Sequence, residues 1–109
     1  MRLTNEIRRE IFDKSVKKAI VIEDEIYEEY KKGDMPQLEY IAKDRQAKAD
    51  IAKEELEEYK KFDGEEAERA IKEATAYIER EESIAKRKLE ELEQMKKDGE
   101  KIKYFVYFI

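Results

Sequence analysis

The sequence contains no cysteine and no histidine, and its 109 residues include only three glycines and one proline. Without cysteine, neither a disulfide framework nor thiolate chemistry is available. Without histidine, the chain lacks the usual base of a catalytic triad and a common metal ligand. The three glycines stand apart, so no phosphate-binding loop or dinucleotide fingerprint is present. We therefore expect a protein that is not an enzyme and that holds no cofactor and no structural metal.

Long hydrophobic runs are also missing. The longest one is Tyr104 to Ile109, which is far shorter than a membrane span. No basic segment followed by an apolar stretch opens the chain, so we expect no signal peptide. These absences predict a cytoplasmic protein.

Charged residues are abundant and make up 49% of the chain. A high content of Glu, Lys, Ala and Leu with few helix breakers is typical of long helices. The charges are distributed unevenly: residues 1–20 carry six basic and three acidic side chains, whereas residues 21–40 carry two basic and seven acidic ones. This polarity could steer a partner, although at physiological salt it acts only over about 8 Å.

Apolar side chains recur at steps of three and four residues, which is the spacing of amphipathic helices and coiled-coil seams. We predict one domain, residues 1–109, with helices over residues 4–32, 35–62 and 65–97. Short connections make these helices antiparallel neighbours. The predicted fold class is all-α, as a three-helix bundle or a slimmer coiled-coil hairpin, with a short C-terminal β-type tail. Alanine dominates the middle helix, so this core is thin and would gain from self-association or a partner.

Capping patterns support these boundaries. Thr4 is a candidate N-cap of the first helix. Gly33 suits the end of that helix, and Asp34 the N-cap of the second. Asp63 and Glu66 have the spacing of a capping box before the third helix.

Three features leave alternatives open. The β-favouring run from Ala19 to Ile22 reads as continuous helix or as a short strand, and the lack of turn signals favours helix. Arg45 interrupts the stripe of the second helix, while Glu81 and Glu82 interrupt that of the third. The acidic pair is either a carboxylate site or a structural interruption, in the form of a local stutter or of a solvent-facing break in the stripe, and the structural interruption is the favoured interpretation.

Two surfaces are candidates for binding a partner. One is an acidic patch on the first helix, which reads as a mimic of nucleic-acid phosphates or as a solvated face; it consists of Glu23, Asp24, Glu25, Glu28 and Glu29. Direct nucleic-acid binding is disfavoured, because the pI is near 5.1 and the basic residues of the first helix spread around it.

The other candidate surface is the tail, residues 101–109, whose aromatic and β-branched content predicts a strand. A strand needs a ladder partner, so the tail either covers the thin core, pairs with a second copy, or enters another protein. The candidate contact residues are Tyr104, Phe105, Val106, Tyr107, Phe108 and Ile109.

The opening Met1-Arg2-Leu3-Thr4-Asn5-Glu6-Ile7-Arg8 resembles the start of small bacteriophage proteins that begin with Leu-Thr-x-Glu-Ile-Arg, some of which are described as nucleotide-modification-associated. The resemblance spans residues 1–20. It implies a phage accessory protein in the host cytoplasm, a class that often blocks a host enzyme or an anti-phage defence complex. The composition also resembles that of designed helical proteins, although the irregular core and the sticky tail argue against design.

Two functional hypotheses follow. The first is a non-enzymatic protein-binding protein, a phage-encoded inhibitor of a host or defence protein that acts by occluding a surface. The alternative is a structural or assembly protein, a homo-oligomer that self-associates through its tail.

Overall fold

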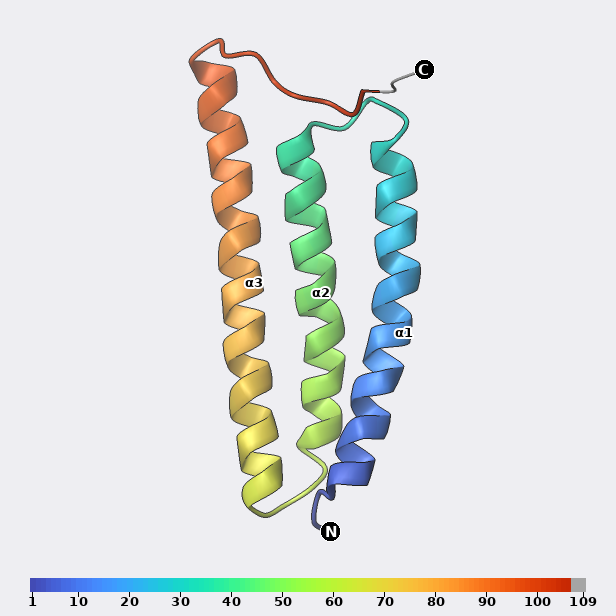
Figure 1. Ribbon diagram of the computed structural model, residues 1–109. Coiled ribbons are helices and arrows are strands. Elements are labelled where there is room, and N and C mark those ends of the chain that lie inside the picture. Colours follow the sequence, from blue (N-terminus) through green and yellow to red (C-terminus); the bar gives the residue numbers. More distant parts are fainter. Residues whose placement is uncertain (107–109) are drawn as a thin grey trace.

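The structure is a computed structural model that describes residues 1–106. It contains three long helices, α1 (Asn5–Tyr30), α2 (Gln37–Tyr59) and α3 (Glu65–Lys97), which make up 77% of the described residues. They run alternately up and down with α2 in the middle (Figure 1). The predicted all-α fold with three long antiparallel helices is confirmed.

The helices form one flat layer. Its extents are 55 × 30 × 15 Å, so it is little thicker than one helix with its side chains. α3 packs on α2 more extensively than α1 does, and α1 and α3 barely approach each other. The bundle is therefore open, with α2 covered on its two sides and less on its faces.

α1 begins as the sequence predicts. The Thr4 hydroxyl accepts a hydrogen bond from the Ile7 backbone N–H at 3.2 Å, which satisfies one of the unpaired donors of the first turn. The helix then continues without a break through Ala19 to Ile22. The helical period of the flanking residues has outweighed the β propensity of this run.

The predicted N-cap Asp34 is wrong. Pro36 occupies the N-cap position of α2 and makes no side-chain cap hydrogen bond. Instead, the Gln37 backbone N–H donates to the carbonyl oxygen of Lys103 at 2.8 Å. A segment from the far end of the chain thus supplies the acceptor that a local cap would have supplied.

The predicted capping box at Asp63 is also wrong. The N-cap of α3 is Gly64, which has a φ of 93° and no side-chain cap hydrogen bond. The Asp63 carboxylate lies 3.4 Å from the amino group of Met1, and the Asp63 backbone N–H donates to the Met1 carbonyl at 3.0 Å. Asp63 is therefore used to hold the start of the chain, a long-range contact that local spacing does not reveal.

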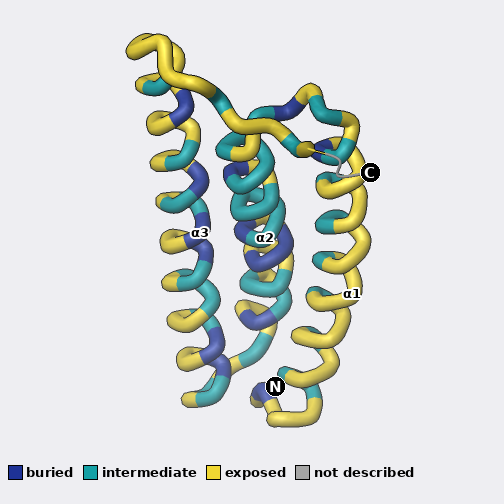
Figure 2. Tube along the Cα trace, turned by 45° about the horizontal axis from the view of Figure 1, so that its top comes forward, coloured by how far each residue is buried: buried dark blue, intermediate teal, exposed yellow. Residues whose placement is uncertain are grey.

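The interface between α2 and α3 consists largely of small side chains. Six alanines are exposed by 5% or less: Ala42, Ala49, Ala52, Ala67, Ala70 and Ala85. Small residues allow close approach of two helices but bury little apolar area each, at ~25 cal/mol per Å². Figure 2 shows buried residues on the facing sides of α2 and α3, whereas α1 is mostly exposed or intermediate.

The two ends of the layer are closed differently. At the end nearest Met1, Leu3 is 4% exposed and packs in a cluster with Tyr59, Ala67 and Ala70. At the opposite end, the segment after α3 crosses over α2 toward α1 (Figure 1).

Gly99 starts this crossing by ending α3. It adopts φ 67°, and its backbone N–H donates to the Lys96 carbonyl while that of Glu100 donates to the Met95 carbonyl at 3.0 Å. This is the Schellman arrangement, in which a left-handed glycine satisfies the last carbonyls of a helix.

The predicted β-type tail is not confirmed. Within residues 1–106 the tail forms an isolated antiparallel bridge between Pro36 and Tyr104 and no strand. Tyr107, Phe108 and Ile109 lie outside the described residues. Among the described helices, none is both long and apolar enough to cross a bilayer.

Candidate interaction surface

A groove of about 1080 Å³ runs along one face of the layer, over α2 and between α1 and α3. Ile51, Ala52 and Tyr59 of α2 belong to its floor, and side chains of α1 and α3 form its walls. The groove exists because the outer helices flank α2 and barely approach each other. Its shape is that of a bundle that lacks one helix.

An apolar stripe lies along the α1 wall. Phe12, Val16 and Ile20 line the groove and are exposed by 55%, 37% and 54%. Their spacing of four residues places them on one helix face. Single exposed apolar residues are ordinary, whereas a contiguous exposed stripe beside a groove is typical of a binding surface.

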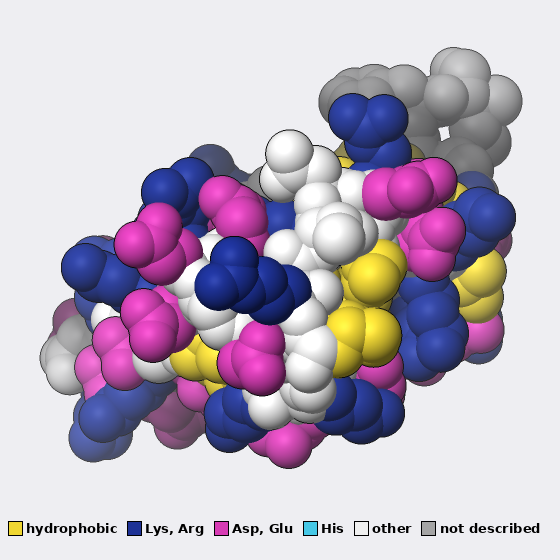
Figure 3. Space-filling view, turned by 90° about the horizontal axis from the view of Figure 1, so that it is seen from below, with side chains coloured by type: hydrophobic (Ala, Val, Ile, Leu, Met, Phe, Trp, Pro, Cys, Tyr) yellow, Lys and Arg dark blue, Asp and Glu magenta, His cyan; other side chains and the backbone are white. Residues whose placement is uncertain are grey.

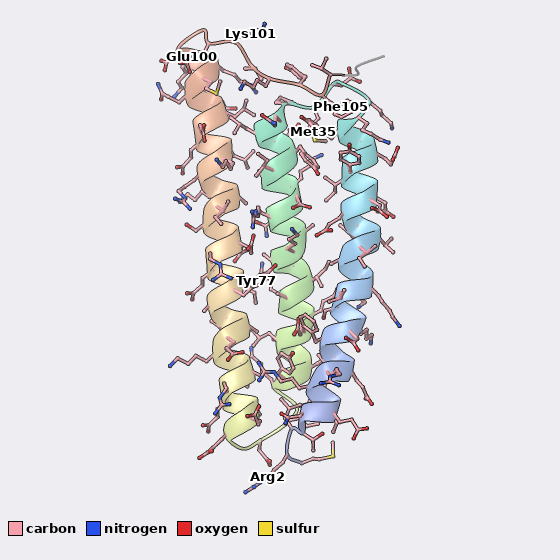
Figure 4. The ribbon with its side chains drawn as sticks, viewed as in Figure 1. Arg2, Met35, Tyr77, Glu100, Lys101 and Phe105 are labelled. Carbon is pink, nitrogen blue, oxygen red and sulfur yellow. The ribbon has the colours of Figure 1, made fainter. Side chains whose placement is uncertain are left out.

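The opposite wall of the groove, formed by α3, contains several small side chains. It includes Ala70, Ala74 and Tyr77 of α3, and Figure 4 shows Tyr77 at mid-height between α3 and α2. The guanidinium of Arg80 stacks over the Tyr77 ring at 5.5 Å from the ring centre. Burial, followed by the negative charge of Glu81, raises the Tyr77 pKa above its usual value.

Arg8 joins α1 to α3 at one end of the groove. Its guanidinium donates to the carboxylate of Glu66 at 3.3 Å and to that of Glu73. Beside it, the buried hydroxyl of Tyr59 donates to the carboxylate of Glu55. Burial and this hydrogen bond raise the Tyr59 pKa well above its usual value. The Tyr59 hydroxyl therefore keeps its proton at physiological pH.

Arg45 and Glu81, which interrupt two apolar stripes in the sequence, contact each other. Arg45 Nη1 lies 3.0 Å and 3.2 Å from the two carboxylate oxygens of Glu81. Glu81 is 3% exposed, so the expectation of a solvent-facing interruption is wrong for this residue. The neighbouring Glu82 pairs with Lys53 at 2.8 Å at a more exposed position. Both carboxylates are thus engaged in pairing α2 with α3.

The acidic patch is partly neutralised by the chain's own lysines. Glu23 lies 3.3 Å from Lys48, Glu28 lies 2.9 Å from Lys31, and Glu29 lies 3.7 Å from Lys43. Asp24 and Glu25 are exposed and have no ion pair within residues 1–106. Three residues of the predicted patch are therefore engaged in ion pairs within the chain, and two are left to interact with a partner.

The described part of the tail is also divided. Phe105 packs edge-on against Tyr30 and Tyr27, with ring centres 5.4 Å and 6.2 Å apart. Figure 4 shows Phe105 near the C-terminal end of α1. Tyr30 in turn stacks on Tyr40 at 4.3 Å. Tyr104 and Val106 are 42% and 63% exposed. Within residues 101–106 the tail thus covers the end of its own bundle, which is one of the three roles predicted for it.

Charges of both signs alternate on the end of the molecule that carries the N-terminus (Figure 3). Apolar side chains appear there only in small patches between them. Nucleic-acid binding generally requires a continuous basic stripe, and this end does not present one. Among the described residues, no group of three or more His, Cys, Asp or Glu side chains is arranged to hold a metal ion.

Comparisons of the chain with protein-family models, with curated proteins and with solved structures found no match. The groove and the residues around it are therefore the basis for a functional conclusion.

Sequence reasoning missed the groove and its apolar stripe. Phe12, Val16 and Ile20 appear in the sequence as ordinary core positions, because their period matches that of the buried stripes. One signal was available: an alanine-rich middle helix cannot fill the space between two outer helices. The pairing of Arg45 with Glu81 had a signal as well, since both break an apolar stripe on neighbouring antiparallel helices.

Proposed function

We propose that this chain is a non-enzymatic protein-binding protein and that the groove is the surface through which it binds. The single observation that carries the proposal is the exposed stripe of Phe12, Val16 and Ile20 along the groove wall. Covering exposed apolar area in a concave surface is favourable in free energy, because the partner removes that area from water. A long groove between two parallel walls fits an amphipathic helix, whose apolar side chains enter at steps of three and four residues.

An inhibitory role is consistent with this mode of binding. A protein that catalyses no reaction can inhibit its partner by covering a surface through which that partner binds another molecule. The narrower identity, a phage-encoded inhibitor of a host or defence protein in the host cytoplasm, rests on the resemblance of residues 1–20 alone.

The groove has displaced the tail as the leading contact surface. Phe105 already packs on Tyr27 and Tyr30 of its own chain. Asp24 and Glu25, the unpaired part of the acidic patch, lie on α1 outside the groove lining. Asp24 flanks the stripe and adds charge selectivity to the groove contact, whereas Glu25 lies on the opposite side of the helix.

Affinity capture with three baits tests this proposal. The wild type is compared with Val16→Glu, which places a charge in the groove, and with Val21→Glu, which places the same charge on α1 at a position that is 56% exposed and outside the groove lining. We expect a partner held by the wild type and by Val21→Glu to be lost with Val16→Glu. Far-UV circular dichroism checks that both variants keep their helices. A partner held equally by all three baits would refute the groove as the binding surface.

A further inference from the structure

The apolar stripe of α1 is symmetric about its centre. Phe12 and Ile20 lie four residues before and four residues after Val16, and both are more than half exposed. When a second α1 lies antiparallel with its stripe turned toward the first, Val16 of one copy meets Val16 of the other. Phe12 of each copy then meets Ile20 of the other.

The charges of α1 follow the same symmetry with opposite signs. Arg9 and Glu23 lie seven residues before and after Val16, and Arg8 and Asp24 lie eight residues before and after it. At 1.5 Å per residue these positions are about 10–12 Å from the centre in each direction. An antiparallel pair therefore places Arg9 of each copy opposite Glu23 and one residue from Asp24 of the other, whereas Arg8 and Asp24 project from opposite flanks of α1. Two-fold symmetry makes each contact occur twice.

Two of these charges are available for such contacts. Arg9 and Asp24 are exposed and form no ion pair within the described residues. Arg8 is held by Glu66 and Glu73, and Glu23 lies 3.3 Å from Lys48. Arg9 and Asp24 are therefore the charges that a partner helix of complementary sequence would engage.

We propose that the partner of the groove face is a second copy of this chain, bound as a two-fold dimer in which the two α1 helices pair antiparallel about an axis near Val16. This inference rests on the proposed function, because it takes the groove face to be a protein-binding surface and names its occupant. The two grooves face each other across the axis, and their exposed stripes are covered together. Because dimer formation depends on concentration, dilution uncovers the face for another partner.

Charge decides the orientation of the pair. Within α1, residues 5–20 carry five basic and three acidic side chains, whereas residues 21–30 carry five acidic side chains and no basic one. Parallel pairing would oppose like charges along the whole helix, whereas antiparallel pairing opposes unlike charges at both ends. The same difference makes the dimer weaken as salt is added.

Single-cysteine variants test the axis and the orientation, because the chain has no cysteine of its own. Val16→Cys lies on the axis, so under mild oxidation it forms a disulfide-linked dimer. Phe12→Cys does not link to itself, because its two copies are about 12 Å apart along the helix direction and a disulfide needs Cβ atoms ~4 Å apart. An equimolar mixture of Phe12→Cys and Ile20→Cys forms the mixed dimer. Val21→Cys, at a 56% exposed position outside the groove lining, is the matched control and forms no disulfide-linked dimer.

Charge reversal provides a second test that does not depend on disulfides. Arg9→Asp weakens the dimer about tenfold in sedimentation equilibrium, since it introduces two repulsive contacts per dimer, and Asp24→Arg does the same. The double variant Arg9→Asp with Asp24→Arg restores part of the lost affinity, because opposite signs return at positions 9 and 24, which lie one residue apart in the antiparallel register, while position 9 still faces Glu23. No restoration, or self-linking of Phe12→Cys as efficient as that of Val16→Cys, would refute antiparallel pairing.

The outcome also separates this inference from the proposed function. A wild type that sediments as a monomer at every soluble concentration, yet loses a captured partner on Val16→Glu, refutes the dimer and keeps the groove as a protein-binding surface. A wild type that neither dimerises nor captures any partner through the groove refutes both.

Discussion

The pair of Arg45 and Glu81 joins one exposed and one buried partner. Arg45 retains 39% side-chain exposure, whereas Glu81 retains 5%. A buried carboxylate is strongly destabilised when its cation is removed, because it loses hydration without gaining a partner. The arginine is required mainly because the glutamate is buried.

We expect Arg45→Met to lower the free energy of unfolding by about 2–3 kcal/mol, below the usual 3–5 kcal/mol for a fully buried pair because Arg45 reaches solvent. The double variant Arg45→Met with Glu81→Leu should recover most of this loss, since no charge is left buried. Urea denaturation measures both. Lys53→Met, which breaks the exposed pair with Glu82, is the matched control and should leave the midpoint almost unchanged. A double variant less stable than Arg45→Met would contradict this account.

Tyr59 makes the stability sensitive to alkaline pH. Its pKa is raised in the folded state by burial and by the hydrogen bond to Glu55, while in the unfolded chain it titrates near 10. The folded state therefore binds the phenolic proton above pH 10 when the unfolded state has released it. Stability is fully present below pH 10 and falls as pH rises from there toward the folded pKa.

Thermal melts between pH 8 and pH 11 measure this dependence. We expect the melting temperature of the wild type to fall above pH 10 and that of Tyr59→Phe to fall less steeply. Tyr104→Phe, at an exposed position, is the control and should retain the wild-type slope. Equal slopes for the wild type and Tyr59→Phe would show that Tyr59 does not carry the effect.

At the residue scale, sequence patterns predicted contacts that are local and missed those that are not. Thr4 caps α1 through a residue three positions away, a spacing visible in the sequence. Asp34 and Asp63 have equally good local patterns, yet their sites are controlled by Lys103 and Met1, from distant parts of the chain. Pairing such as that of Arg45 with Glu81 depends on the register between helices, which composition does not specify.

The tail stabilises the end of the layer that lies opposite the N-terminus. Its Lys103 carbonyl accepts from the first turn of α2, and the ring of Phe105 packs on Tyr27 and Tyr30. Both contacts lie within one chain. Their loss should therefore act at any protein concentration.

We expect deletion of residues 104–109 to lower the free energy of unfolding by about 1–3 kcal/mol, and Phe105→Ala to account for much of that loss, less than the 3–5 kcal/mol of a fully buried Phe because this ring is half-buried. The shift in melting temperature between full-length and truncated protein should be the same at low and high concentration. Val106→Ala, at a 63% exposed position, is the control. A shift that grows with concentration would assign the tail to an intermolecular contact instead.

The three helices were the most predictable elements. Their bounds fall within three residues of those expected from the apolar period, and α3 matches at both ends. The tail was the least predictable, because aromatic and β-branched content indicates a strand only where a ladder partner exists. The described tail residues meet α2 and α1 end-on and form a single bridge.

At the scale of the whole molecule, one thin layer is held together unequally. The α2–α3 pair shares the buried alanines, whereas α1 adds few buried side chains between its ends. α1 is attached near its start by Leu3 and Arg8 and near its end by Tyr30 and the ring of Phe105. The middle of α1, where the exposed stripe lies, is the least supported part of the three helices.

This inequality predicts a gradient of local stability, because segments with few buried contacts open without unfolding the remainder. We expect backbone amides of residues 12–20 to exchange with solvent deuterium at least about tenfold faster than those of residues 49–56 and 71–78, which corresponds to ~1.4 kcal/mol less protection. Hydrogen exchange read by mass spectrometry at low protein concentration measures this directly. Raising the concentration should slow exchange in residues 12–20 alone, since dimerisation covers that stretch, and Val16→Glu should abolish this slowing. Uniform protection of all three helices at every concentration would mean that the layer opens only as a whole, and that α1 needs no second copy to hold its middle in place.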